Sequence, residues 1–157
     1  MAKPNLRDPV QLLAFGFGSG LSPAAPGTAG SALALLMYCL APPLSPIWHA
    51  LLLIPATVLG IWLCGSASEK LGVHDHSGIV WDEFVGIWIA VWALPKTWIW
   101  LLLAFLLFRF FDVVKPWPIG WLDRTTRGGF GIMIDDIVAG VFANACLLTL
   151  YLLAPFS

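Results

Sequence analysis

Charged residues are scarce in this chain. Only 11% of its 157 residues are Asp, Glu, Lys or Arg, while 59% are apolar; an average soluble domain has about 25% charged residues. This composition argues against an ordinary soluble domain and predicts a single integral-membrane domain over residues 1–157. We expect membrane lipids around it, and neither a nucleic-acid partner nor an evident protein partner.

Cysteine is also rare. The three cysteines stand apart in apolar runs without a CxxC pair, which argues against a zinc site, a redox centre or a disulfide framework. Three common phosphatase motifs are absent as well: Cys-x5-Arg, Lys-x6-Arg-Pro and Asp-x-Asp-x-Thr. A phosphatase built on this chain would therefore need other chemistry.

Long apolar runs make up most of the chain and predict an all-α fold, a polytopic membrane helical bundle with about four to five membrane-embedded helices. The predicted crossings are 30–41, 47–64, 84–94, 98–108 and 137–153, the last belonging to a helix over 132–153. The first has 12 residues, fewer than the ~20 that cross a bilayer. It either crosses with help from its flanks or forms a re-entrant half.

Alternating crossings would place the amino terminus and two loops on one side of the membrane. That side would hold seven of the eight Lys and Arg residues, with Lys96 alone on the other. The excess of positive charge makes it the cytoplasmic side. All nine carboxylates fall on the same side, which favours one reaction centre at one interface.

Two acidic pairs share a pattern with a glycine one helical turn further on: Asp82-x-x-x-Gly86 and Asp136-x-x-x-Gly140. A glycine there lets a neighbouring helix approach closely beneath the acid. Two such helices would bring together Asp82, Glu83, Asp135 and Asp136. Carboxylates that close favour a hard cation, Mg²⁺ or Mn²⁺. The competing interpretation is that the acids simply complement the dipoles of their helices. Two acidic pairs on the same side of the membrane favour the metal site over this interpretation.

The His74-Asp75-His76 run lies six residues before Asp82. Asp75 is a candidate metal ligand or general base, and the two histidines are candidates for metal binding, proton transfer or phosphate binding. A solvated loop is the competing interpretation.

Basic residues near the acids predict a phosphate site. Arg109, Asp112 and Lys115 fall at i, i+3 and i+6 on roughly one helical face. Arg offers a fork for phosphate and Lys a point charge, although an Arg/Asp pair with a snorkelling lysine explains the spacing equally well.

Arg124 is a further candidate for an anionic headgroup, or simply flanking charge. The Pro- and Gly-rich loop 22–31 suits anion binding, with Thr28 and Ser31 as candidate contacts.

Short motifs follow one another along nearly the whole chain: FGSGLSP at 17–23, PGT at 26–28, GS at 30–31, GVHDH at 72–76, IVWDEF at 79–84, FD at 111–112, KPWPI at 115–119 and GIMIDDIVAG at 131–140. In this order and spacing they resemble the bacterial phosphatidylglycerophosphatase A family. The resemblance implies an all-helical, magnesium-dependent inner-membrane enzyme that converts phosphatidylglycerophosphate to phosphatidylglycerol. Its acidic motifs carry over onto Asp75, Asp82, Glu83, Asp135 and Asp136.

The leading hypothesis is a lipid phosphatase. Its metal ligands would be Asp82, Glu83, Asp135 and Asp136; its catalytic set Asp75, Asp82, Asp112, His74 and His76; and its substrate contacts Arg109, Lys115, Thr28, Ser31 and Arg124. Two alternatives remain open. A divalent-cation transporter component would need carboxylates at midplane depth, and a CDP-lipid-dependent phosphotransferase would need a nucleotide pocket.

Overall fold

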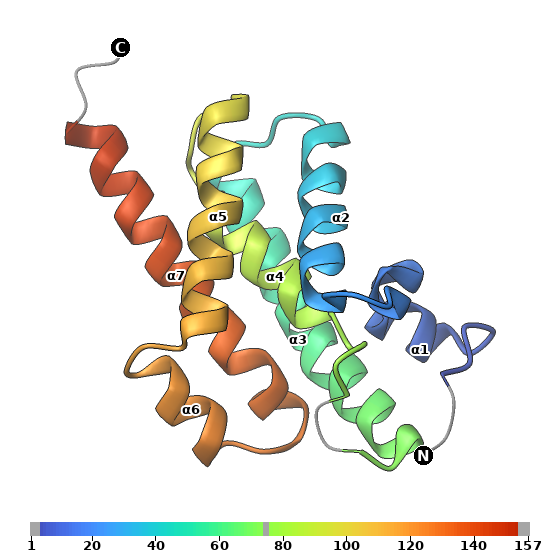
Figure 1. The fold of residues 1–157 in the computed structure, drawn as a ribbon. Coiled ribbons are helices and arrows are strands. Elements are labelled where there is room, and N and C mark those ends of the chain that lie inside the picture. Colours follow the sequence, from blue (N-terminus) through green and yellow to red (C-terminus); the bar gives the residue numbers. More distant parts are fainter. Residues whose placement is uncertain (1–3, 74–75, 154–157) are drawn as a thin grey trace.

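A computed structural model describes residues 4–73 and 76–153, and within these ranges every regular element is a helix (Figure 1). In chain order the elements are α1 (Pro9–Ala14), the 3-10 helix η1 (Gly16–Leu21), α2 (Pro26–Leu40), α3 (Pro46–Leu71), α4 (Trp81–Ala90), α5 (Trp98–Val114), α6 (Ile119–Thr125) and α7 (Gly128–Leu153). The all-helical prediction is confirmed.

Helix α4 forms the centre of the bundle. It packs against α2, α3, α5 and α7, and Figure 1 shows it enclosed among them. Eight of its ten residues are buried, including Asp82 and Glu83 in its first turn. A helix that is apolar nearly all round has to be covered on every side, so the other helices surround α4 and fix the position of its two acids.

Helices α4 and α7 cross where Gly86 and Gly140 meet. A Cβ added to Gly140 would come 2.5 Å from the Gly86 carbonyl oxygen, and one added to Gly86 would collide with the ring of Phe108. Backbone therefore lies directly against backbone, one turn beyond Asp82 on one helix and Asp136 on the other. The predicted close approach at these glycines is confirmed.

Two helices within the described ranges are long and apolar enough to cross a membrane. They are α3 and α7, with 26 residues each, about 39 Å at 1.5 Å per residue, against ~30 Å for the hydrocarbon core. The other predicted crossings are shorter: α2 has 15 residues, α5 has 17 and α4 has 10. The expected four to five spans are thus not confirmed, because α4 is only about half the bilayer core in length.

Helix α3 extends well past its predicted end at Cys64 and reaches Leu71. Packing supports this extra length despite its polar residues. Lys70 pairs with Asp8 at 2.5 Å, and Gly65 lies against the backbone of Gly129 in α7. The residues that directly follow the predicted crossing 47–64 are therefore the last two turns of a helix.

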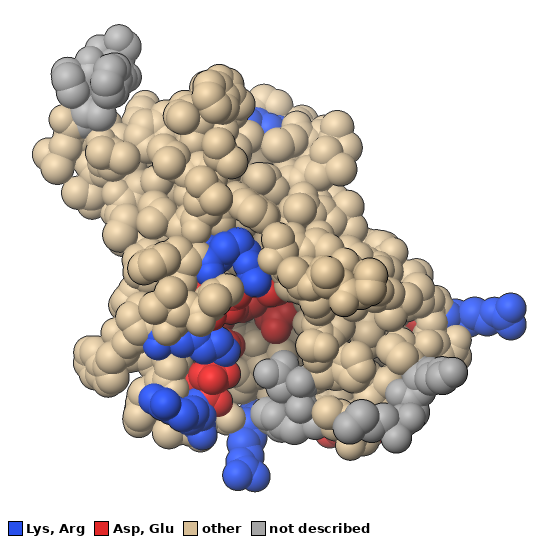
Figure 2. Space-filling view, viewed as in Figure 1, with Lys and Arg blue, Asp and Glu red and all other residues tan. Residues whose placement is uncertain are grey.

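Charged side chains are concentrated toward one end of the molecule. In the view of Figure 2 they gather in and below a central hollow, whereas the upper half is almost entirely uncharged. Lys96 belongs to the opposite end, in the loop between α4 and α5, where its ammonium donates to the Ala41 carbonyl at 2.5 Å. The fold thus separates an apolar end from an acidic one.

Candidate active site

A polar cavity of about 260 Å³ opens where the start of α4, the end of α5 and the first half of α7 meet. Its charged lining consists of five carboxylates and two bases: Asp82, Glu83, Asp112, Asp135, Asp136, Arg109 and Lys115. Figure 2 shows acidic atoms at the bottom of the hollow with basic side chains at its rim. Because drug-sized ligands occupy about 300–1,000 Å³, this cavity suits a phosphate group better than a whole lipid.

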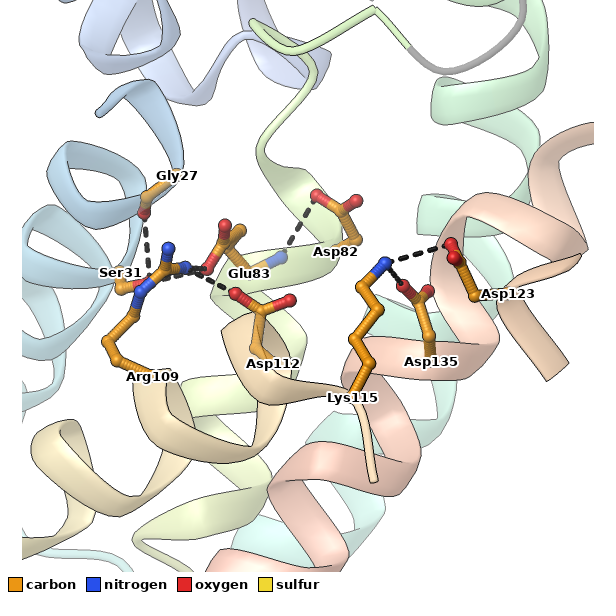
Figure 3. A network of polar contacts seen from close by, with 9 residues as sticks. All are labelled: Gly27, Ser31, Asp82, Glu83, Arg109, Asp112, Lys115, Asp123 and Asp135. Atoms are coloured by element: carbon orange, nitrogen blue, oxygen red, sulfur yellow. Dashed lines mark hydrogen bonds and ion pairs between the residues drawn. The ribbon is translucent and has the colours of Figure 1, made fainter. Parts of the chain in front are cut away.

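One half of the site is organised around Arg109, near the end of α5. Its Nη1 lies 2.5 Å from Glu83 Oε2 and 2.8 Å from Asp112 Oδ2. The hydroxyl of Ser31, on α2, lies 2.5 Å from the same Glu83 oxygen and 2.9 Å from the Gly27 carbonyl (Figure 3). Arg109 therefore ties α2, α4 and α5 together, and a guanidinium with five N–H donors retains capacity for a phosphate.

Gly27, in the first turn of α2, lies directly against Glu83. A Cβ on Gly27 would collide with the Glu83 carboxylate, so a larger residue would displace that side chain. Pro26 at the first helical position starts α2 four residues earlier than predicted, which suits proline because its missing N–H needs no helical partner. This early start brings the turn onto Glu83.

The other half of the site is organised around Lys115, which follows α5. Its Nζ lies 2.7 Å from Asp135 Oδ2 and 2.8 Å from Asp123 Oδ1 (Figure 3). Burial lowers the pKa of Lys115, but the hydrogen bonds and charges of Asp123 and Asp135 outweigh it and raise that pKa well above its ordinary value. Lys115 is therefore a permanent cation at the wall of the cavity.

Three carboxylates come close enough to share a metal ion. One oxygen each from Asp112, Asp135 and Asp136 lies within 4.8 Å of the other two. The cavity as a whole has three more carboxylates than cations, an excess that a buried site relieves by taking up protons or a cation. Oxygen-only donors suit Mg²⁺ or Mn²⁺, so the donor set fits a hard divalent cation.

The predicted metal ligands are all present in the cavity, but in unequal surroundings. Asp82 lines it from the first turn of α4, its Oδ1 accepting from the backbone N–H of Glu83 at 3.0 Å. The Glu83 carboxylate is held by Arg109 and Ser31. Asp112 was predicted as a catalytic residue and not as a metal ligand. It lies with Asp135 and Asp136 of α7 in the group of acids that could hold a metal ion. Each assignment of a role remains a prediction.

Other predicted residues lie at or beyond the edge of the site. The His76 ring packs against Phe15, with centroids 5.4 Å apart, and its Nδ1 accepts from the Gly78 N–H at 3.0 Å. Arg124 is exposed on α6, and Thr28 is half-buried in the first turn of α2. None of these three is among the described residues that line the cavity. His74 and Asp75 lie outside the described residues.

Sequence reasoning missed Asp123, which pairs with Lys115. The two residues are separated by a turn through Pro116 and Pro118, after which α6 begins. A lysine followed by a proline turn and an acid was the available signal. It was too weak to use without knowing how α6 packs.

Replacing Ser31 with alanine should destabilise the fold. Ser31 is fully buried, and its hydroxyl donates to a buried carboxylate, an interaction worth about 1.5–3 kcal/mol when one partner is charged. We expect a lower thermal unfolding midpoint in detergent for Ser31→Ala. Ser22→Ala, which removes a hydroxyl bonded only locally to the Ala24 carbonyl, is the matched control. Equal midpoints for the two variants would contradict this account.

Comparisons with known proteins agree with the motifs. The family model described as Phosphatidylglycerophosphatase A matches residues 12–151. The Escherichia coli (strain K12) protein described as Phosphatidylglycerophosphatase A is 48% identical over 150 residues, covering 94% of this chain and 87% of the relative. A Haemophilus influenzae protein with the same description is 46% identical, covering 91% and 89%.

A Bacteroides thetaiotaomicron protein described as "Putative phosphatidylinositol-3-phosphatase" is 42% identical over 140 residues, covering 84% of this chain and 87% of the relative. No solved structure matches the chain.

Proposed function

Because the chain belongs to the phosphatidylglycerophosphatase A family, we propose that it hydrolyses phosphatidylglycerophosphate to phosphatidylglycerol and inorganic phosphate in phospholipid biosynthesis. The observation that carries the proposal is the cavity in which Arg109 and Lys115 stand among five carboxylates. A phosphomonoester needs cationic groups around its oxygens, and the acids supply sites for a divalent metal.

Magnesium is the proposed cofactor. Asp112, Asp135 and Asp136, with Asp82 beside them, would hold it, and Mg²⁺ when bound polarises phosphoryl oxygens and makes water a better nucleophile. In the reaction the oxygen of a water molecule bonds to phosphorus while the P–O bond to the glycerol breaks. A carboxylate of the site accepts a proton from the attacking water, and the departing glycerol alkoxide takes up a proton.

The chain's own residues bind and orient the phosphate. Arg109 is fixed by two carboxylates and Lys115 by two more, so neither has to be ordered when substrate arrives. Such preorganisation is where much of the rate enhancement in phosphoryl transfer arises. The ~260 Å³ cavity takes the phosphate and leaves the acyl chains in the bilayer.

We further propose a multi-pass protein of the bacterial inner membrane with this cavity at the cytoplasmic face. The lengths of α3 and α7 support two crossings, and the exposed apolar side chains on α3, such as Ile54 and Val58, suit contact with lipid. The end of the molecule that holds the acids also holds most of the basic residues, as the positive-inside rule expects of the cytoplasmic side. The shorter helices would be embedded between these two.

Phosphate release by the purified protein in mixed micelles tests this function. We expect hydrolysis of phosphatidylglycerophosphate that EDTA abolishes and added Mg²⁺ restores. Phosphatidylinositol 3-phosphate, the substrate named for the Bacteroides relative, measures headgroup selectivity in the same assay.

Three results would count against the proposal. Phosphate release that EDTA does not affect would rule out a required metal. Transfer to or from a CDP-lipid without phosphate release would favour the phosphotransferase. Metal flux into proteoliposomes without hydrolysis would favour the transporter.

A further inference from the structure

We propose that Asp123 is a positioning residue: with Asp135 it holds the Lys115 ammonium so that its remaining N–H points at the substrate phosphate. This inference rests on the proposed function. It concerns a residue on α6 that is not among the described residues lining the cavity, so any contribution it makes must act through Lys115.

The geometry of the ammonium carries the argument. Lysine has three N–H donors on a flexible four-carbon stem. Two of them are engaged by Asp123 and Asp135, at 2.8 and 2.7 Å (Figure 3). In a tetrahedral group, fixing two bonds fixes the direction of the third. A single carboxylate would leave the ammonium free to rotate about that one contact.

The backbone around Lys115 is arranged to make this second contact. Lys115 adopts a left-handed conformation, with φ 46° and ψ 55°, where α5 ends. A Cβ on Gly120 would come 2.7 Å from the Lys115 carbonyl oxygen, so the first turn of α6 lies directly against Lys115. Ile119, fully buried, anchors that turn in the core. Asp123 stands three residues after Gly120 and therefore on the same face of α6.

The two carboxylates differ in what else they can do. The Asp135 side chain is 9% exposed and lies in the acid cluster, whereas that of Asp123 is 34% exposed. Without Asp123 the ammonium would be drawn toward Asp135 alone, and its position relative to the phosphate would change. Asp123 thus supplies the pull that opposes Asp135.

The test is a double-mutant cycle on the full-length protein in mixed micelles with phosphatidylglycerophosphate. We expect Asp123→Ala to raise KM about 10-fold, the size of one charge-assisted contact, with kcat changed less than about threefold. Asp123→Glu, which keeps the carboxylate, should return KM to within about threefold of wild type. In a Lys115→Ala background, Asp123→Ala should have no further effect.

Asp8→Ala is the matched control, because Asp8 also pairs with a lysine, Lys70 at 2.5 Å, away from the cavity. It should leave KM unchanged. An equal loss from Asp123→Ala with and without Lys115 would overturn the inference, because Asp123 would then act through the fold alone. So would an unchanged KM in the wild-type background. In both cases hydrolysis by the wild-type protein would leave the proposed function standing, whereas an inactive wild type would overturn both.

Discussion

The Asp136→Asn variant should lose at least about 100-fold in kcat/KM while folding as well as wild type or better. Asp136 is almost fully buried, and one of its oxygens lies within 4.8 Å of oxygens of Asp112 and Asp135. Even the outer partners of metal ligands typically contribute 10–100-fold, so removing a ligand should cost more. Asparagine keeps the shape and removes one of several mutually repelling charges.

Metal affinity and apo-protein stability should therefore change in opposite directions in this variant. Mn²⁺ titration followed by EPR should show weaker binding, and the thermal midpoint in EDTA should stay or rise. Asp8→Asn, which changes an acid paired with Lys70 outside the cavity, should leave the Mn²⁺ affinity unchanged. Wild-type Mn²⁺ affinity in Asp136→Asn would rule out Asp136 as a ligand.

The Gly140→Leu variant should lose both stability and activity. A Cβ at this position would already come 2.5 Å from the Gly86 carbonyl oxygen, and backbone cannot move aside as a flexible side chain can. Overpacking typically costs about 1–3 kcal/mol. Separating α4 from α7 also moves the acids of the two helices apart, and a shift of about 1 Å can cost 100-fold in rate.

Ala145→Leu is the matched control, because it adds the same side chain to an exposed position of α7. We expect a near-normal midpoint in detergent and normal phosphate release for this control, against a lowered midpoint and at least about 100-fold lower activity for Gly140→Leu. If the two variants behaved alike, the α4/α7 crossing would not be what positions the site.

Much of this fold was predictable because local sequence determines it. Apolar runs located the long helices, and Pro116 and Pro118 lie just beyond the end of α5 at Val114, as proline's missing N–H requires. The end of α3 was not predictable from hydropathy, since it depends on two contacts with distant segments, Asp8 with Lys70 and Gly65 with Gly129. The crossing predicted at α4 stays unconfirmed, because a short buried helix and part of a membrane span have the same composition.

The gathering of the α4 and α7 acids around one cavity was predictable, whereas their pairings with the bases were not. Adjacent acids one turn before a glycine identified both halves of the cavity, because that spacing puts charge and close packing on one helix face. Which acid meets which base depends on how α4, α5 and α7 are rotated against one another. Sequence alone could therefore not place Glu83 on Arg109, nor Asp112 beside Asp135 and Asp136.

The order in which the segments of the site are synthesised determines when each of its contacts can form. The Val80 N–H donates to the Ala14 carbonyl at 2.8 Å, so this contact of the amino-terminal segment can form only after about half of the chain has been made. Arg109 and Glu83 can pair once α5 is complete, but Asp135 and Asp136 arrive with the final helix. A ribosome-bound chain that stops before α7 therefore contains the Arg109/Glu83 pair without Asp135 and Asp136, and the proposed metal site would be complete only in the finished protein.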